Sequence, residues 1–247
     1  MRATGSSPCI QMRESQEILS EPIAIIAGTG NVGLGLALRW ARGGSKVLLG
    51  SRAIHKARAA ADRVRQALPT CEVEPCHYSE AVQRAPVVSL ALPLNARRGV
   101  LKSLSAYWRP GMIVIDTTVP LEHSVGGRLS HILPLWEGSA AQQTARYLPA
   151  GVRVTAALHC VSANSLQNLE KPVKSDVLVV GDDREAREIT RNWIRKISGI
   201  RVIDAGSLEN ARYAEHLAAL LISLNLRHKV DSCGVRFTGL PGLEDDA

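Results

Sequence analysis

Short runs of apolar residues alternate along this chain with stretches in which apolar residues recur at helical spacing. A short run predicts a strand buried on both faces of a sheet, and the recurring pattern predicts an amphipathic helix. Strands are expected at 23–27, 46–50, 86–93, 111–116, 153–158, 176–181 and 201–204, with a weaker candidate at 72–74. Helices are expected at 53–68, 95–104, 139–147, from Asp182 or Asp183 to about 197, and at about 209–229. Strands that alternate with helices predict an α/β fold built on a doubly wound parallel sheet with right-handed crossovers.

The first apolar run leads directly into a glycine-rich turn, which is followed by an apolar helical pattern. The turn has the spacing GxGxxG, in the residues Gly28-Thr29-Gly30-Asn31-Val32-Gly33. This strand–turn–helix order is that of a dinucleotide-binding fingerprint, in which Gly28 permits the tight turn, Gly30 lets the backbone approach a pyrophosphate, and Gly33 lets the helix pack close to the strand. The N–H groups and the dipole at the start of the helix attract phosphates. We therefore predict a nucleotide site here, the alternative being a glycine-rich turn with a structural role only.

The end of the second apolar run indicates which nucleotide is bound. Ser51 and Arg52 lie where an NAD enzyme carries an Asp or Glu that binds the ribose 2′-hydroxyl. A hydroxyl and a guanidinium suit a 2′-phosphate instead, and Lys56 lies one helical turn further on. Cations at a helix N-terminus are unfavourable unless an anion compensates them. These residues predict NADP(H), the alternative being an exposed basic helix start.

The composition narrows the classes of partner. The formal net charge of +7 favours acidic ligands, but no basic run is interleaved with aromatic residues, so nucleic acid is not an expected partner. The cysteines are five in number and lack metal-ligand spacing, so neither a metal site nor a disulfide framework is predicted. No apolar stretch is long enough to span a bilayer, and the N-terminus lacks the apolar core of a signal peptide. We expect a cytoplasmic protein that binds small molecules and not a membrane.

The pattern also predicts a division into domains. Residues 1–20 are polar and aperiodic, and they are expected to form a flexible extension. Residues 21–150 are predicted to form the nucleotide-binding Rossmann-type domain, with a boundary near residue 150 before the remaining strands and the long helix of residues 151–247. Between 122 and 138 Gly, Pro and His interrupt the apolar pattern, which predicts a long loop over the site.

Four segments together resemble the NADP oxidoreductases that use coenzyme F420, an 8-hydroxy-5-deazaflavin. They are the fingerprint with Gly35, Gly50-Ser51-Arg52, Ala157-Leu158-His159, and 181–183 together with 204–212. The resemblance covers roughly residues 22 to 238. It implies hydride transfer between NADP(H) and coenzyme F420, with the deazaflavin lying against the nicotinamide in a cleft between two domains. The resemblance implies that residues 151–247 form the smaller C-terminal α/β domain, whose long helix closes this substrate cleft. It also implies a homodimer, for which the long C-terminal helix is a candidate surface.

The resemblance implies roles for individual residues. The pyrophosphate region would contact Thr29, Asn31 and Val32, and the 2′-phosphate would be held by Ser51, Arg52 and Lys56. The nicotinamide would be flanked by Pro93 and by the loop Thr118-Val119-Pro120, and the deazaflavin would be lined by the segment around His159. After the Leu-His pair the family continues with an apolar residue and a proline, whereas this chain has Cys160-Val161-Ser162.

Hydride transfer between two heteroaromatic rings requires no nucleophile and no metal, only close approach of the rings and the exclusion of water. His159 is the candidate catalytic residue, because it could donate to a ring carbonyl or phosphate; the alternative is a core-edge histidine bonded to backbone. Arg97 and Arg98 could attract an acidic substrate tail or form a solvated face. The residues alone leave two other functions open: an NADPH-dependent reductase of a flavin, imine or carbonyl compound, and a regulatory protein that binds NADP without turnover.

Overall fold

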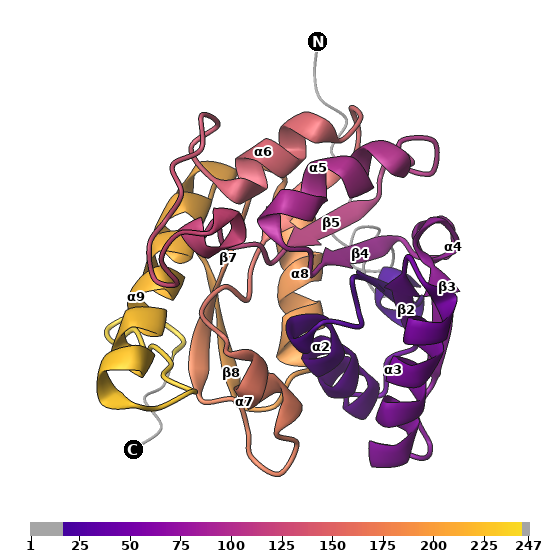
Figure 1. Cartoon of the computed structure of the whole chain (residues 1–247), viewed down its shortest axis with the longest axis horizontal. Coiled ribbons are helices and arrows are strands. Elements are labelled where there is room, and N and C mark those ends of the chain that lie inside the picture. Colours follow the sequence, from indigo (N-terminus) through magenta and orange to yellow (C-terminus); the bar gives the residue numbers. More distant parts are fainter. Residues whose placement is uncertain (1–16, 244–247) are drawn as a thin grey trace.

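The structure, a computed structural model, describes residues 17–243 and has the α/β architecture that the alternating pattern predicts (Figure 1). Its strands are β1 (Ile23–Ile26), β2 (Val47–Ser51), β3 (Val73–His77), β4 (Val87–Leu90), β5 (Ile113–Asp116), β6 (Arg153–Ala156), β7 (Ser175–Gly181) and β8 (Ile200–Asp204). Its helices are α2 (Asn31–Arg42), α3 (Ile54–Ala67), α4 (Tyr78–Arg84), α5 (Leu94–Ser103), α6 (Ala140–Tyr147), α7 (Ala163–Gln167), α8 (Arg184–Arg195) and α9 (Ala211–His228), with 3-10 turns η1 (Glu122–Val125) and η2 (Leu208–Asn210). Each predicted strand is confirmed, including the weak candidate that became β3.

The strands form one sheet in the order β3-β2-β1-β4-β5-β6-β7-β8. From β3 to β6 every pairing is parallel, and this order is that of a Rossmann fold. The prediction of a parallel sheet was wrong at one pairing, because β7 pairs antiparallel with β6. The reason lies in the connection, where α7 is only five residues long and does not carry the chain back across the sheet to the start of β6. Only the end of β7 overlaps β6, through Thr155↔Gly181 and Ala156↔Val180, so β7 and β8 extend the sheet beyond the carboxyl end of β6.

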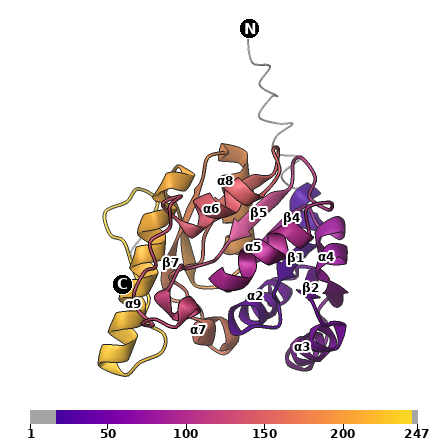
Figure 2. The ribbon, with the colours of Figure 1, turned by 45° about the horizontal axis from the view of Figure 1, so that its top comes forward.

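Helices cover both faces of the sheet. Ile23 and Ile25 of β1 point into one apolar core shared with α2, α3 and α8, while Ala24 and Ile26 point into the opposite core shared with α4, α5 and α6. Figure 2 shows α5 and α6 in front of the sheet and α8 behind it. The sheet runs without interruption past residue 150, because β6 pairs with β5, and the division into two domains stays a prediction.

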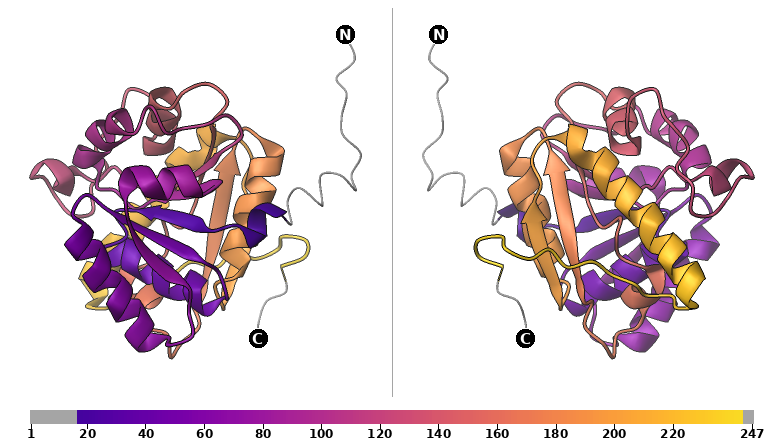
Figure 3. Two further views of the ribbon diagram at one scale, coloured as in Figure 1. Left: turned by 90° about the vertical axis from the view of Figure 1, so that its right-hand side faces the viewer. Right: turned by 90° about the vertical axis from the view of Figure 1, so that its left-hand side faces the viewer.

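The long C-terminal helix α9 lies beside β7 and β8, at the opposite end of the molecule from β3 and α3 (Figure 3). Asp183 caps α8 by accepting a hydrogen bond from the Ala186 N–H at 2.7 Å, whereas Asp182 accepts one from the Leu208 N–H at the start of η2. None of the helices in residues 17–243 is both long and apolar enough to cross a membrane.

The N-terminal extension predicted for residues 1–20 lies, for residues 1–16, outside the described residues. Residues 17–20 are helical. Ile18 and Leu19 pack against the core on the side of α2 and α8, and the Leu19 carbonyl accepts a hydrogen bond from Lys196 at 3.2 Å.

Candidate active site

Two cavities open at the carboxyl edge of the parallel strands, where ligands of this fold class bind. The first, here called the β1–β2 cavity, has a volume of about 480 Å³. It brings together six of the predicted site residues: Thr29, Gly30, Ser51, Arg52, Lys56 and Pro93. The second, the β5–β6 cavity, has a volume of about 280 Å³ and is lined by three more, Val32, Val119 and His159.

The glycines of the fingerprint have distinct surroundings. A Cβ on Gly33 would lie 2.5 Å from the Ala27 carbonyl oxygen, and one on Gly28 would lie 2.8 Å from the Leu49 side chain, so both positions require close packing. A Cβ on Gly30 would meet no atom nearer than 3.5 Å, which leaves its backbone open to a ligand. The left-handed conformation in this turn falls on Ala27, with φ of 63°. No side chain caps α2 and its first turn has no acidic residue, so no side chain of the described residues competes with an anion for the first N–H groups of this helix.

The corner after β2 is basic and preorganised. Ser51 is buried, and its hydroxyl oxygen accepts a hydrogen bond from the Ala53 N–H at 3.3 Å, which leaves the hydroxyl proton for a ligand. Arg52 and Lys56 are exposed, and neither takes part in an ion pair with any of residues 17–243. The first turn of α3 has no acidic residue. Two cations at an uncapped helix start therefore lack a protein anion to compensate them.

Tyr78 also lines the β1–β2 cavity and was not found by sequence reasoning. It begins α4, directly after His77, which pairs with Ser51 in the sheet. Burial raises the pKa of Tyr78, and the neighbouring Arg52 guanidinium opposes this rise. The only signal in the sequence was an aromatic residue at the end of the weak strand next to β2.

The β5–β6 cavity is walled on one side by α9, through Ala218, Leu221, Ile222 and Asn225. On the other side the chain leaves β6 through Leu158, which has φ of 68°. A left-handed conformation is strained for a branched side chain, and such strain is concentrated at functional sites. The predicted Leu-His segment is therefore a sharp turn that faces α9.

His159 is almost completely buried, and neither of its ring nitrogens has a hydrogen-bond partner among residues 17–243. It is thus not the backbone-bonded histidine that was the alternative reading. Burial lowers the pKa of His159 to about 4, although the nearby Asp116 carboxylate opposes this. At neutral pH the ring is uncharged, with one N–H donor and one acceptor nitrogen.

A buried polar cluster lies next to His159. Asp116, at the end of β5, accepts hydrogen bonds from the Thr118 N–H at 2.8 Å and from the Thr144 hydroxyl at 2.6 Å. Arg97 is completely buried, lies 3.5 Å from the Asp116 carboxylate, and donates to the Gln143 side chain at 2.5 Å. The solvated face predicted for Arg97 was wrong, because its side chain is completely buried beside the Asp116 carboxylate that it compensates. Its attraction of an acidic substrate tail stays a prediction.

Comparison with known proteins agrees with this geometry. The family model for coenzyme F420-dependent NADP oxidoreductases matches residues 22–120. The F420-dependent NADP reductase of Methanothermobacter thermautotrophicus is 42% identical over 231 residues, which cover 92% of this chain and 99% of that protein. The chain belongs to this family. The F420-dependent NADP reductase of Methanocaldococcus jannaschii is 35% identical over 222 residues, which cover 88% of this chain and 98% of that protein.

A solved structure of a candidate F420-dependent NADP reductase from Arthrobacter superposes with a TM-score of 0.75 and covers 89% of this chain and 100% of that one. At 24% identity it supports the fold alone. The family resemblance and the Rossmann-type α/β fold expected from the sequence are confirmed.

Other predicted site residues of this family member line neither cavity. Asn31 begins α2, and its carbonyl accepts a hydrogen bond from the Gln167 side chain at 2.9 Å. Thr118 is buried with its hydroxyl 3.5 Å from the Leu92 carbonyl, and the Pro120 carbonyl accepts a bond from the Leu133 N–H. Their expected contacts with the nucleotide stay predictions.

Residues 17–243 include no group of three or more His, Cys, Asp and Glu side chains able to hold a metal ion. Burial raises the pKa of the Cys160 thiol to about 12, so this cysteine beside His159 is a protonated, unreactive thiol at neutral pH.

Proposed function

We propose that this protein transfers a hydride between NADP(H) and coenzyme F420. The observation that carries the proposal is that Val32, of the fingerprint helix, lines the same cavity as Leu158 and His159. The segment expected to contact the deazaflavin thus lies in one cavity with a residue expected to contact the pyrophosphate region of the nucleotide. The identity of 42% over nearly the whole chain to a protein named F420-dependent NADP reductase supports the same activity.

The β1–β2 cavity fits NADP(H). The open space at Gly30 and the uncapped start of α2 suit a pyrophosphate. The hydroxyl of Ser51 and the unpaired cations of Arg52 and Lys56 suit a ribose 2′-phosphate. Pro93, at the far wall of this cavity, and Val119, in the β5–β6 cavity, would direct the nicotinamide from one cavity to the other.

The β5–β6 cavity fits the deazaflavin. When bound, the two rings supply a hydride donor and a hydride acceptor, and no group of the protein needs to form a covalent bond. The apolar side chains of α9 exclude water from the rings. The uncharged imidazole of His159 can donate a hydrogen bond to an oxygen or nitrogen of the acceptor ring, which would stabilise negative charge that develops there.

The assembly and location form part of the proposal. The helix α9 exposes Tyr213, Leu220 and Leu226, with exposed fractions of 65%, 55% and 57%, and helical spacing places the first two on one side of it. Large apolar side chains exposed along one helix suit an interface, so a homodimer formed through α9 is proposed. A reducing cytoplasm suits the free thiols of Cys71, Cys76, Cys160 and Cys233, and small molecules rather than nucleic acid are proposed as partners.

An anaerobic absorbance titration tests the activity. NADPH added to oxidised 8-hydroxy-5-deazaflavin and enzyme is expected to bleach the long-wavelength band of the deazaflavin in proportion to the nucleotide consumed. No change at saturating concentrations would reject the proposal. Bleaching of a flavin only, or oxidation of NADPH by an imine or carbonyl compound only, would identify a different reductase. Tight binding of NADPH with no compound that accepts its hydride would indicate a regulatory protein.

A further inference from the structure

Tyr78 has no part in the hydride transfer described above, yet it lines the β1–β2 cavity next to the corner expected to hold the 2′-phosphate. It is the first residue of α4 and directly follows β3, whose last residue, His77, pairs with Ser51 in the sheet. Because β2 and β3 are parallel, their carboxyl ends lie side by side. Tyr78 therefore lies near Arg52 in space, although α3 and β3 separate the two residues in the chain.

The ring of Tyr78 lies against the backbone of Gly50. A Cβ on Gly50 would lie 3.2 Å from Cδ1 of this ring and 3.0 Å from the Ile25 carbonyl oxygen, so the ring occupies space that a side chain on β2 would take. The ring also packs against the apolar core on the side of α4, α5 and α6. A tyrosine can bury its ring in this way while its hydroxyl keeps a polar partner. Packing of the ring thus fixes where the hydroxyl lies before a ligand binds.

The hydroxyl oxygen of Tyr78 faces two hydrogen-bond donors of the cavity wall. Burial raises the pKa of Tyr78, and the Arg52 guanidinium and the Ala27 N–H both oppose this rise. A guanidinium and a backbone N–H can only donate, whereas a phenol oxygen can accept. Ala27 is the residue with left-handed backbone conformation that precedes Gly28. One oxygen therefore faces both the turn expected to bind the pyrophosphate and the arginine expected to bind the 2′-phosphate.

The chemistry of this partner suits an arginine that has to bind an anion. Arg52 is exposed and forms no ion pair with any of residues 17–243. A long side chain that is ordered only when the ligand arrives weakens binding, because its rotamer freedom is lost at that step. A carboxylate could also order Arg52, but it would repel a phosphate. The uncharged hydroxyl of Tyr78 can order the guanidinium and leave its positive charge available.

We propose that Tyr78 is a positioning residue of the nucleotide site, whose hydroxyl holds the Arg52 guanidinium toward the ribose 2′-phosphate and so strengthens the preference for NADP(H) over NAD(H). The inference rests on the proposed function, because it takes the β1–β2 cavity as the site of NADP(H). It adds a residue from the end of β3 to the three residues after β2. Since the role concerns the 2′-phosphate alone, loss of the hydroxyl should weaken the binding of NADPH and not that of NADH.

Binding of the two nucleotides without any hydride acceptor tests this role. NADPH and NADH differ only in the 2′-phosphate, and calorimetry on the full-length protein gives a Kd for each. Tyr78→Phe keeps the ring that packs against Gly50 and removes the hydroxyl alone. The Kd for NADPH should rise about 5-fold, because the ligand must then order Arg52, while the Kd for NADH should stay within a factor of about two.

A double-mutant cycle shows whether the hydroxyl acts through Arg52. Arg52→Ala alone should raise the Kd for NADPH about 10-fold, since a charge-assisted hydrogen bond at an exposed site is lost. When Tyr78→Phe is added to Arg52→Ala, the Kd for NADPH should change by less than a factor of about two, because no guanidinium remains to be held. A residue that merely supported the cavity would have the same effect in both backgrounds.

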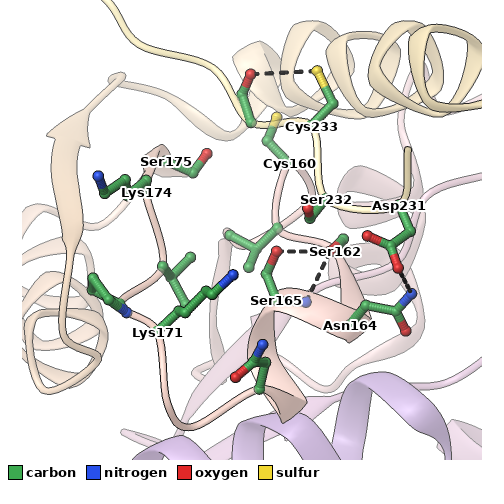
Figure 4. A pocket seen from close by; sticks show the side chains of 15 residues that line it. Cys160, Ser162, Asn164, Ser165, Lys171, Lys174, Ser175, Asp231, Ser232 and Cys233 are labelled. Carbon is green, nitrogen blue, oxygen red and sulfur yellow. Dashed lines mark hydrogen bonds between the residues drawn. The ribbon is translucent and has the colours of Figure 1, made fainter. Parts of the chain in front are cut away.

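Each substitution has a matched control. Tyr147→Phe removes the hydroxyl of another tyrosine beside an arginine, because the Arg98 guanidinium lies 5.9 Å from the centre of the Tyr147 ring, and Tyr147 lines neither the β1–β2 nor the β5–β6 cavity. Lys174→Ala removes an exposed cation that has no ion-pair partner among the described residues. Lys174 lines a different cavity, formed by α7, the chain that leads into β7, and the C-terminal tail (Figure 4). Neither control should change the Kd for NADPH or for NADH.

Three outcomes would overturn the inference while the proposed function stands. They are an unchanged Kd for NADPH in Tyr78→Phe, an equal rise in Kd for both nucleotides, and an equal effect of Tyr78→Phe with and without Arg52. Equal Kd values for NADPH and NADH in the wild-type protein would reject NADP(H) as the preferred nucleotide of the proposed function, and the inference with it. Thermal melting of each variant shows that a change in Kd comes from a folded protein.

Discussion

Replacing Arg52 by Asp places a carboxylate where the 2′-phosphate of NADPH is expected to bind. Arg52 follows β2 in the β1–β2 cavity, is exposed, and has no ion-pair partner among residues 17–243 that the change would disrupt. The folded structure should therefore tolerate the substitution, and its effect should fall on nucleotide selection. We expect the preference to move from NADPH towards NADH.

The magnitude follows from two contributions. Loss of a charge-assisted hydrogen bond costs about 2 kcal/mol, towards the lower end of its range because the guanidinium is exposed. Repulsion between the new carboxylate and the phosphate adds about 1 kcal/mol at contact distance in water. At about 1.4 kcal/mol per factor of ten, kcat/KM for NADPH should fall about 100-fold. A carboxylate that accepts from the 2′-hydroxyl of NADH contributes about 1 kcal/mol, which should raise kcat/KM for NADH about 5-fold.

Initial rates with both nucleotides, at fixed deazaflavin concentration and low salt, measure the ratio of the two kcat/KM values. Arg63→Asp is the matched control, since Arg63 is exposed on the same helix α3 but lies outside the cavity. That control should leave the ratio within a factor of about two. If Arg52→Asp also leaves the ratio unchanged, then the 2′-phosphate does not bind at the end of β2 and the assignment of this corner is wrong.

Three further predictions concern stability. Gly33→Ala should lower the free energy of unfolding by about 2 kcal/mol, because the added Cβ would lie 2.5 Å from the Ala27 carbonyl oxygen. Gly99→Ala is the control: its Cβ meets no atom within 4 Å, so the free energy of unfolding should rise by up to about 1 kcal/mol, and urea titrations compare the two variants. Burial raises the pKa of Glu215 to about 8, so the stability that its protonated form contributes is complete below about pH 4.5 and is lost as pH rises through 8. The Tm difference between Glu215→Gln and wild type should therefore shift in favour of the variant between pH 5 and pH 9, as thermal melts at the two pH values would show. Burial alone would raise the pKa of Asp176, but hydrogen bonds from arginines and a backbone N–H lower it overall. Asp176→Asn should therefore cost most stability at neutral pH and progressively less as pH falls below 4, which thermal melts at several pH values would show.

The parts of the fold that the sequence predicts are those with local signals. An apolar run such as that of β4 is buried on both faces wherever its neighbours lie, and the fingerprint combines strand, turn and helix within a few residues. The close packing expected at Gly33 is visible in the structure, and Gly30 has open space at the place where the pyrophosphate is expected. Ser51, Arg52 and Lys56 lie within one strand end and one helical turn, so the chain brings them together without long-range contacts.

The parts that the sequence does not predict depend on contacts between distant segments. Arg97 looks like a surface residue because its partners Asp116 and Gln143 are 19 and 46 positions away. The apolar stripe of α9 predicts a helix but does not tell which residues face the β5–β6 cavity. Arg39 likewise is a basic residue on an amphipathic helix, and its four backbone partners become apparent only when α7 packs against α2.

Direct hydride transfer between the two rings is the central claim, and isotope transfer in a single turnover tests it most directly. NADPH that carries deuterium at the transferred position of C4 is mixed with enzyme and oxidised deazaflavin in ordinary water, and the reduced deazaflavin is analysed by mass spectrometry. One deuterium per molecule, at C5 of the ring, is predicted. A reduced product that contains only hydrogen from water, or deuterium that stays on the nucleotide, would contradict the account.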